Sequence, residues 1–476
     1  MPSPVINVAQ MREWEQASWA AGRSQPDVIA RVGELVARRA RQMTAPGGSI
    51  LILAGKGHNG DDARAAREHL NDYPVQVLNV KEPEAALTEV ANLVDQKPAL
   101  IIDGLFGIGL NRQLDEKWMA LLQCVNDFKT LVLAVDVPSG FNADTGQPEG
   151  AAIRASVTLT LGAPKGGMLF SSAWPYVGRL EVAPDIGLIP CPHPSETTWT
   201  LPTDFHNFPP ARPVASHKGD CGRVAIISGS LGYHGAAVLT ARGAQRAQPG
   251  LITLFTQENV YHAVAAQLQA VMVHIWQPNL KLPGDFNSIL IGPGLAAKDL
   301  PDMKISTRHL WRDVPVPIVV DASALDWIQF GPLPKHVIRV ITPHPGEAAR
   351  LLRATSQQVQ ADRPAALREI SRRFGNCWVV LKGHQTLIGR SNGPIRVNSS
   401  GNPHLAQGGS GDLLGGYLAG LLAQPALQAD PEKTICYGVW QHGAAADRLT
   451  NARKNWVVED LSAEIGNESS LAPKSP

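Results

Sequence analysis

Two blocks of alternating strand-like and helix-like segments, separated by a proline-rich stretch, constrain the fold of this chain most. Seven prolines fall within the 24 residues from Pro190 to Pro213, and no regular hydrophobic period survives there. Because proline interrupts both helices and central strands, we place a domain boundary in this stretch. A chain of 476 residues holds about two or three domains. We expect two, residues 1–212 and residues 213–476.

The first block predicts a doubly wound, mostly parallel α/β sheet of the Rossmann-like kind. Short β-rich runs alternate there with helical patterns, which is the signature of βαβ units. The expected strands are residues 49–54, 75–80, 99–103 and 130–137. The expected helices are residues 61–70, 83–95 and 113–125, with a helical arm near residues 8–43 packed on the sheet.

The second block repeats the alternation and predicts another α/β domain. Its expected strands are residues 223–228, 251–255, 288–292, 318–321, 337–342 and 377–382. Two helical patterns rich in Gly, Ala and Leu, beginning at Gly411 and Pro431, close the block. The glycine motifs of the two blocks differ in spacing and chemistry, so we expect two different domains rather than an internal repeat.

Charge and cysteine content exclude several classes of protein. Forty-three Lys and Arg against 42 Asp and Glu leave a net charge of +1, so no bulk field attracts nucleic acid or an anionic membrane. The five cysteines are far apart and include no CxxC pair, which indicates neither a disulfide framework nor a zinc site. Charged residues interrupt the N-terminus before any signal-like apolar run, and no apolar run predicts a membrane span. We expect a cytoplasmic protein with no nucleic-acid or membrane partner.

A glycine-rich turn follows the first expected strand. Residues 55–60 fit GxGxxG and open a helix, which favours the diphosphate of a dinucleotide at a helix N-terminus. Asp61 and Asp62 directly follow, and two carboxylates in that position would repel a phosphate. From this motif alone, a ligand site and a plain strand-to-helix turn both stay open.

Polar residues also follow two further expected strands. Because the carboxyl ends of parallel strands share one crevice, Asn59, Asp103, Asp136 and Ser139 can converge. Carboxylate, amide and hydroxyl oxygens suit a hard cation. The loop after Asp103 carries Arg112, which suits a phosphate.

Four motifs of this block, in order, resemble the NAD(P)H-hydrate epimerase domain over residues 5–200. They are Gly57-His58-Asn59-Gly60-Asp61-Asp62, Asp103-Gly104-Leu105-Phe106-Gly107-Ile108-Gly109, Asp136-Val137-Pro138-Ser139-Gly140 and Gly162-Ala163-Pro164-Lys165. That family interconverts the R and S epimers at C6 of the hydrated nicotinamide ring and binds potassium. The resemblance implies potassium ligation by Asn59, Asp103 and Ser139. The substrate contacts it implies are His58, Asn59, Gly60, Asp61, Asp62, Gly107, Ile108, Gly109, Leu110, Asn111, Arg112, Gln113 and Asp136.

Epimerisation at a carbon that carries a leaving hydroxyl needs proton transfer, and we expect Asp136 and Lys165 to be its acid–base pair. The family usually reads Asn-Asn-Gly-Gly-Asp-Gly, so this chain departs from it at His58, Asp61 and Ala63. The N-terminal arm also lacks the family's acidic or amide residue before an Ala-Gly pair. A mainly structural N-terminal domain therefore stays an alternative.

The second block carries a pattern typical of phosphoryl transfer. Residues 408–412 read Gly-Gly-Ser-Gly-Asp at the start of a helix, where free N–H groups can hold a phosphoryl group and Asp412 can accept the proton of an attacking hydroxyl. A plain glycine turn capped by Asp is the alternative. No GxxxxGK[ST] sequence occurs, which excludes a P-loop. Lys382–Thr386 follows a strand and suits a nucleotide, and His344 stands between prolines in a stiff turn, as a ligand contact would.

These segments resemble the ADP-dependent NAD(P)H-hydrate dehydratases of the ribokinase-like superfamily over about residues 215–465. The further motifs that carry the resemblance are Gly219-Asp220-Cys221-Gly222-Arg223, Gly229-Ser230, Gly235-Ala236, Ile291-Gly292-Pro293-Gly294 and Thr342-Pro343-His344-Pro345-Gly346-Glu347. The resemblance implies binding of the S hydrate by Ala236, Gly294, His344 and Asp412. It implies binding of the adenine nucleotide by Lys382, Gly383, His384, Gln385, Thr386 and Gly411. Ser323 stands where the family often has Asp.

The implied mechanism has three steps: Asp412 deprotonates the C6 hydroxyl, ADP or ATP with Mg²⁺ phosphorylates it, and phosphate leaves as NADH or NADPH is restored. With ADP, the other product is AMP. We therefore predict a bifunctional repair enzyme, an epimerase followed by a dehydratase, and expect a homo-oligomer. The alternatives are a ribokinase-like small-molecule kinase and a nucleotide-binding sensor, each with a non-catalytic N-terminal domain.

Overall fold

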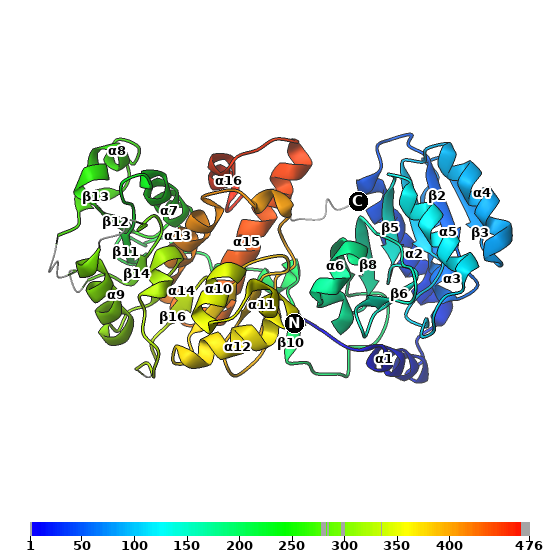
Figure 1. The fold of residues 1–476 in the computed structure, drawn as a ribbon, viewed down its shortest axis with the longest axis horizontal. Helices are drawn as coiled ribbons and strands as arrows, with labels where there is room; N and C mark the ends of the chain where they lie inside the picture. The colour runs from blue at the N-terminus through cyan, green and yellow to red at the C-terminus, as the bar shows by residue number, and fades with distance from the viewer. Residues whose placement is uncertain (1, 278–281, 283–284, 297–299, 335, 468–476) are drawn as a thin grey trace. The chain divides into compact units, whose positions relative to one another are not determined.

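The chain forms two compact α/β units in the computed structural model, which describes residues 2–277, 282, 285–296, 300–334 and 336–467 (Figure 1). One unit is residues 3–199, and the other begins at Thr200 and includes Pro2. The division falls inside the proline-rich stretch. Phe205 packs against Tyr437 and Trp440, with ring centroids 5.7 and 5.3 Å apart, which explains why the chain after Thr200 belongs with the second unit.

The sheet of residues 3–199 is parallel throughout, in the order β3-β2-β4-β5-β8-β9. Its strands are β2 (Ile50–Ala54), β3 (Val75–Asn79), β4 (Leu100–Gly104), β5 (Leu131–Val135), β8 (Val157–Leu161) and β9 (Arg179–Ala183). The strand order reverses between β2 and β4, and ligands of open parallel sheets bind in the crevice at such a reversal.

Helices cover both faces of this sheet because successive residues of a strand point to opposite sides. Ile50 and Ile52 pack in one core with α1 (Val8–Ala20) and α2 (Gln25–Met43). Leu51 and Leu53 pack in another core with α4 and α5, while α3 follows β2. These three helices span Pro83–Asp95, Glu116–Asp127 and His58–Ala65. The expected doubly wound α/β fold is confirmed.

The sheet of the second unit runs β19-β18-β17-β16-β15-β14-β11-β12-β13, parallel from β13 to β17 and antiparallel beyond. Its strands are β11 (Arg223–Ile227), β12 (Leu251–Thr256), β13 (Met272–Ile275), β14 (Ser288–Ile291), β15 (Ile318–Val320), β16 (Arg339–Ile341), β17 (Trp378–Leu381), β18 (Leu387–Gly389) and β19 (Ile395–Val397). Its longer helices are α7 (His234–Arg246), α9 (Pro301–Asp313), α10 (Pro345–Leu352), α12 (Arg363–Arg373), α13 (Ser410–Leu422) and α15 (Pro431–Ala452). The order reverses between β11 and β14.

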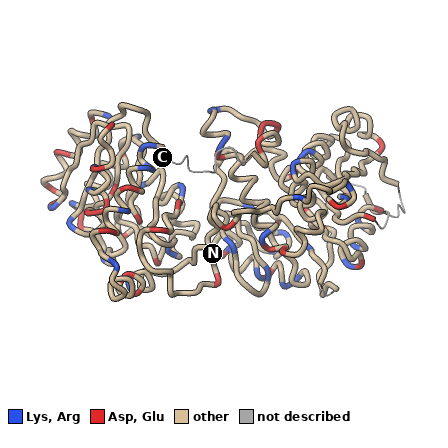
Figure 2. Tube along the Cα trace, turned by 180° about the vertical axis from the view of Figure 1, so that it is seen from behind, with Lys and Arg blue, Asp and Glu red and all other residues tan. Residues whose placement is uncertain are grey.

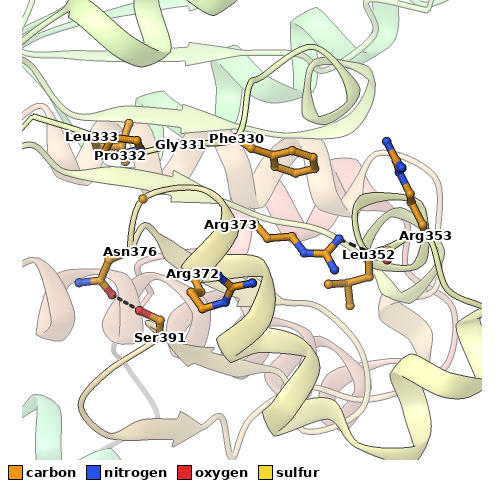
Figure 3. A pocket seen from close by; sticks show the side chains of 11 residues that line it. Phe330, Gly331, Pro332, Leu333, Leu352, Arg353, Arg372, Arg373, Asn376 and Ser391 are labelled. Carbon is orange, nitrogen blue, oxygen red and sulfur yellow. Dashed lines mark hydrogen bonds between the residues drawn. The ribbon is translucent and has the colours of Figure 1, made fainter.

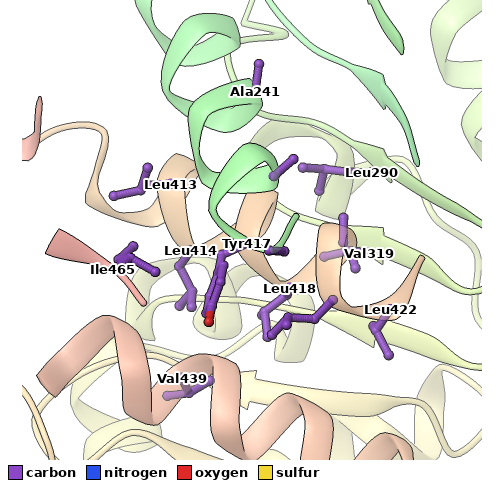
Figure 4. Packing of buried hydrophobic residues seen from close by; sticks show 14 of the residues in the cluster. Ala241, Leu290, Val319, Leu413, Leu414, Tyr417, Leu418, Leu422, Val439 and Ile465 are labelled. Carbon is purple, nitrogen blue, oxygen red and sulfur yellow. The ribbon is translucent and has the colours of Figure 1, made fainter. Parts of the chain in front are cut away.

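Helix α13, which begins inside the Gly-Gly-Ser-Gly-Asp motif, is the centre of this unit. Figure 4 shows its apolar residues packed among α7, α15 and strand residues such as Leu290 and Val319. Helices α7 and α13 approach so closely that a Cβ on Gly416 would lie 1.9 Å from the Thr240 carbonyl oxygen. This tight packing fixes the middle of α13 against α7.

Gly416→Ala is therefore expected to destabilise the second unit by roughly 1–3 kcal/mol, the usual cost of overpacking. The new methyl group would meet backbone, which cannot rotate away. Thermal unfolding followed by circular dichroism measures the loss. Gly235→Ala, on α7 with nothing within 4 Å of its Cβ position, is the matched control and should not lower stability. Equal melting of both variants would contradict the close packing.

Charged residues of both signs are interspersed along both units (Figure 2), as the net charge of +1 suggests. Within the described residues, no helix combines the length and apolar character needed to span a membrane.

Candidate active sites

The reversal between β2 and β4 brings three of the predicted residues together. Asp103, fully buried on β4, accepts hydrogen bonds from the Ser139 backbone N–H (2.8 Å) and hydroxyl (2.6 Å). The Asn59 amide nitrogen donates to the Phe106 carbonyl (2.9 Å), and Ser139 Oγ lies 3.3 Å from the same oxygen. Burial raises the pKa of Asp103 to about 6, although its hydrogen bonds with Ser139 oppose the rise. The oxygens of this group are chemically suited to a hard monovalent cation.

Asp136 and Lys165 form a buried ion pair at the end of β5. Asp136 has left-handed backbone geometry (φ 60°), and its Oδ1 accepts hydrogen bonds from Lys165 (2.5 Å), the Thr160 hydroxyl (3.0 Å) and the Leu161 N–H (3.0 Å). Lys165 is 0% exposed, and its ammonium also donates to Thr160 Oγ1 and the Leu161 carbonyl. Lys165 therefore orients Asp136, while Oδ2 of Asp136 accepts none of these bonds.

The loop after β2 divides its predicted residues between the interior and the surface. Asn59, Gly60 and Asp62 are buried. The side chain of His58 is 76% exposed, and Asp61 pairs with Arg64 at 2.6 Å. Burial, together with the neighbouring carboxyl groups of Asp136, Asp61 and Glu15, raises the pKa of Asp62 to about 8.

The predicted loop after β4 begins beside this group and ends at the surface. A Cβ on Gly107 would lie 3.2 Å from Asn59 Cβ. Leu110 and Ile108 are half-buried against the two cores, whereas Gly109, Asn111 and Arg112 are exposed. Gln113 donates to Glu149 (3.0 Å). The structure thus brings the first part of this loop to the crevice.

In the second unit, four charged residues meet at the start of α13. Lys382 Nζ donates to Asp321 Oδ1 (2.9 Å) and lies 4.0 Å from Glu347 Oε2. A Cβ on Gly411 would lie 3.3 Å from Lys382 Nζ, so the lysine stands at the helix mouth. Burial raises the pKa of Asp412 to about 6; Asp321 and Glu347 add to the rise, and Lys382 opposes it.

The loops at the reversal between β11 and β14 are joined to each other. Ser230 Oγ donates to the Gly294 carbonyl (2.6 Å), and a Cβ on Gly294 (φ 66°) would lie 2.8 Å from Ala236 Cβ. Only glycine fits this position. The predicted contacts Ala236 and Gly294 are therefore adjacent in space.

His344 is held by its own turn. It is the N-cap of α10: its Nδ1 accepts from the Gly346 N–H (3.0 Å), and its backbone N–H donates to Glu347 (2.8 Å). With Nδ1 as an acceptor, Nε2 carries the proton. Nε2 lies 3.6 Å from Glu347 Oε1, and the side chain is 54% exposed, so this edge of the ring is also accessible to a ligand.

Hydrogen bonds from Arg363 hold the backbone of the predicted nucleotide loop. This buried guanidinium donates to the carbonyls of Leu381 (3.1 Å), His384 and Gln385 (3.2 Å), and burial lowers its pKa to about 10. Gln385 is itself buried, and within the described part of the chain its amide atoms have no hydrogen-bond partner. These amide atoms, in the loop predicted to bind nucleotide, are therefore available to a ligand.

A cavity of about 860 Å³ contains none of the predicted residues (Figure 3). Two of the three arginines that line it already bind protein groups: Arg373 donates to the Leu351 and Leu352 carbonyls, and Arg372 and Arg373 both pair with Glu369. These contacts hold the ends of α10 and α12, so we do not assign the cavity to the chemistry.

Comparison with known proteins decides the family. Residues 224–469 match the family model described as NAD(P)H-hydrate dehydratase, and residues 81–167 match that of the YjeF-related protein N-terminus. The bifunctional NAD(P)H-hydrate repair enzyme of Gloeobacter violaceus is 34% identical, over 99% of this chain and 98% of that one. The chain belongs to the family of bifunctional NAD(P)H-hydrate repair enzymes.

Two solved structures are similar to the second unit of this family member. A ribokinase-like superfamily protein of Enterococcus faecalis is 25% identical, with a TM-score of 0.50, and covers 57% of this chain and 95% of that one. The ADP/ATP-dependent NAD(P)H-hydrate dehydratase of Bacillus subtilis, co-crystallised with ATP and Mg²⁺, is 30% identical over 54% of this chain and 91% of that one, with a TM-score of 0.48. The ribokinase-like fold expected for the second unit is confirmed.

Several residues that shape these sites were not predicted to have a role. Asp321, Glu347 and Arg363 surround the predicted nucleotide loop, and Glu15 faces the first site from α1. His442 of α15 places its Nε2 3.1 Å from the Ser410 carbonyl oxygen. Burial lowers its pKa to about 4, so a neutral imidazole holds the start of α13. Asp321 and Glu347 follow the ends of expected strands, so their positions in the sequence could have indicated a role at the site. His442 lies within a helix, and its position gives no such indication.

Proposed function

We propose that this chain repairs hydrated NADH and NADPH in two steps. The first unit interconverts the R and S hydrates at C6, and the second dehydrates the S hydrate with an adenine nucleotide, releasing AMP and phosphate from ADP. The observation that carries the proposal is the position of Asp412 at the mouth of α13, beside the Lys382–Asp321 pair. A base and a cation at a helix N-terminus are the parts that phosphoryl transfer to a hydroxyl requires.

The dehydration follows from this arrangement. Asp412 accepts the proton of the C6 hydroxyl, whose oxygen attacks the terminal phosphorus of the nucleotide. The N–H groups of Gly409 and Gly411 and the ammonium of Lys382 stabilise the charge on the transferred phosphoryl group. The C6–O bond then breaks, phosphate leaves with the electron pair, and a proton is lost from C5 as the ring double bond returns.

Two ions fit the oxygen ligands that the sites provide. Asn59, Asp103 and Ser139 would hold K⁺, whose charge would offset the buried Asp103 carboxylate. Asp321 and Glu347 would hold Mg²⁺ that arrives with the nucleotide and neutralises its phosphate oxygens. The homo-oligomer and the cytoplasmic location stay predictions.

Recovery of reduced nicotinamide tests the proposal. The purified chain, given a mixture of R and S hydrates with ADP and Mg²⁺, should restore the near-ultraviolet absorbance of the whole mixture. If only the S fraction recovered and the R fraction followed at the spontaneous rate, the proposed epimerase activity would be contradicted. If neither fraction recovered, the proposed dehydratase activity would be contradicted. That result would favour a small-molecule kinase, or a nucleotide-binding sensor if the chain still bound nucleotide.

A further inference from the structure

The acid–base pair predicted for the epimerase site, Asp136 and Lys165, makes Lys165 the expected proton donor if Asp136 is the base. Lys165 is poorly placed to donate a proton to the substrate, because its buried ammonium donates to Asp136, Thr160 and Leu161. Those three acceptors match its three protons, and none belongs to a substrate. The donor must be another group at the same crevice.

Among the described residues at this crevice, Asp62 is the remaining buried carboxyl group whose position suits this role. It is 8% exposed, and its side chain forms no hydrogen bond or ion pair with the rest of the described chain. It belongs to α3, which follows β2, whereas Asp136 follows β5. Strand β4 lies between β2 and β5, so the two carboxyl groups flank the crevice in which the potassium ligands of β4 and its neighbours meet.

We propose that Asp62 is the catalytic acid of the epimerase site, acting opposite Asp136 on the C6 oxygen, and that Glu15 is a positioning residue for it. The inference rests on the proposed function and adds the direction of proton transfer. Two carboxyl groups on opposite sides of a ring can serve its two faces in turn.

The step balances with water as the only co-reactant. Asp62 gives its proton to the C6 hydroxyl, the C6–O bond breaks, and water departs with the electron pair while the N1 lone pair forms a C6=N1 iminium ion. Water then adds to C6 from the other face and gives its proton to Asp136, and the C6=N1 electrons return to N1. The proton passes back from Asp136 to Asp62 through water in the crevice. The opposite epimerisation uses the same steps in reverse.

The charges around Asp62 favour a neutral carboxyl group. The carboxyl groups of Asp136, Asp61 and Glu15 act on it, and after burial they are the causes that raise its pKa. Glu15 is itself half-buried; burial and Asp136 raise its pKa, and Lys165, His58 and Arg12 oppose the rise. Asp62 therefore carries a proton at neutral pH, whereas Oδ1 of Asp136 is held by the Lys165 side chain.

Three variants of the full chain test the inference. Asp62→Asn should lower kcat for epimerisation of a pure epimer by roughly 10²–10⁴-fold, leave KM nearly unchanged, and leave dehydration of the S hydrate at the native rate. Asp72→Asn, an exposed residue of the same unit with the same change of charge, is its control. Because the acid must be protonated, native epimerisation should decline above about pH 8. Glu15→Gln should move that decline to lower pH, and Glu13→Gln, on the exposed side of α1, should not.

Each result decides the question. A folded Asp62→Asn variant that keeps more than about a tenth of the native rate, against the expected loss, would overturn the inference, as would an unshifted decline in Glu15→Gln. The Glu15→Gln profile also decides the matter if Asp62→Asn does not fold. A native chain that dehydrates but does not epimerise would overturn the proposed epimerase itself, a different outcome from an active native chain with an active Asp62→Asn variant.

Discussion

Replacing Asp412 with Asn is expected to lower the rate of dehydration of the S hydrate by roughly 10²–10⁴-fold, the usual effect of removing a general base. Asn keeps the size of the side chain at the start of α13 but cannot accept the proton of the C6 hydroxyl. Epimerisation should continue at the native rate, because its proposed residues belong to the other unit. Near-ultraviolet absorbance of a pure S hydrate with ADP and Mg²⁺ measures the first activity, and chromatography of the epimers without nucleotide measures the second.

The pH dependence gives an independent check of the same residue. Burial raises the pKa of Asp412 from 3.8 to about 6, and the base acts only when ionised, so native dehydration should rise with pH through about 6. The folded chain also binds this proton more tightly than the unfolded chain. The contribution of Asp412 to the free energy of unfolding therefore falls as pH rises from about 4 to about 6. Because Asn does not ionise, the Asp412→Asn variant does not lose this free energy of unfolding as the pH rises. It should be at least as stable as the native protein at neutral pH.

Asp326→Asn is the matched control for this prediction. Asp326 pairs at the surface with Arg350, at 3.3 Å, and its replacement makes the same change of charge in the same unit. Both activities should stay at the native rate. A folded Asp412→Asn variant that dehydrates normally, or one that loses epimerisation, would show that the base has been misassigned.

The strands that carry these sites were predictable because their residues are continuously apolar and buried. The runs at 50–54, 100–104 and 223–227 are strands within one residue of the expected bounds. Since carboxyl ends of parallel strands meet in one crevice, the meeting of Asn59, Asp103 and Ser139 followed from sequence order alone. Strand β8 was missed because Thr158 and Thr160 interrupt its apolar pattern, although both are buried and hydrogen bonded.

What the sequence could not provide is the pairing of side chains from distant segments. The carboxylate of Asp321 and the ammonium of Lys382 are 61 positions apart, yet they form one ion pair. Glu15 lies in a helical arm whose pattern indicated only packing, and the docking of that arm brings it to Asp136 and Asp62. His442 reaches Ser410 across 32 positions. These contacts depend on how helices pack on the sheet, which local periodicity does not specify.

Replacing Asp136 with Asn is expected to have the opposite selectivity, lowering epimerisation by roughly 10²–10⁴-fold and leaving dehydration of the S hydrate unchanged. Asn is the appropriate substitution because Asp136 has φ 60°, a backbone geometry that Asn tolerates better than Ala. Its Oδ1 can still accept the Leu161 N–H and the Thr160 hydroxyl. What it loses is the charge that balances Lys165.

That lost charge makes a second variant necessary. Breaking a buried pair by removing one partner typically costs about 3–5 kcal/mol, whereas replacing both partners is often nearly neutral. The first unit of the Asp136→Asn variant should therefore have a lower melting temperature than that of the native protein. Adding Lys165→Met should recover most of the stability without restoring epimerisation. If the double variant regained epimerase activity, Asp136 would be a structural partner of Lys165 rather than the base. If either folded variant failed to dehydrate pure S hydrate, the division of the two reactions between the two units would be wrong.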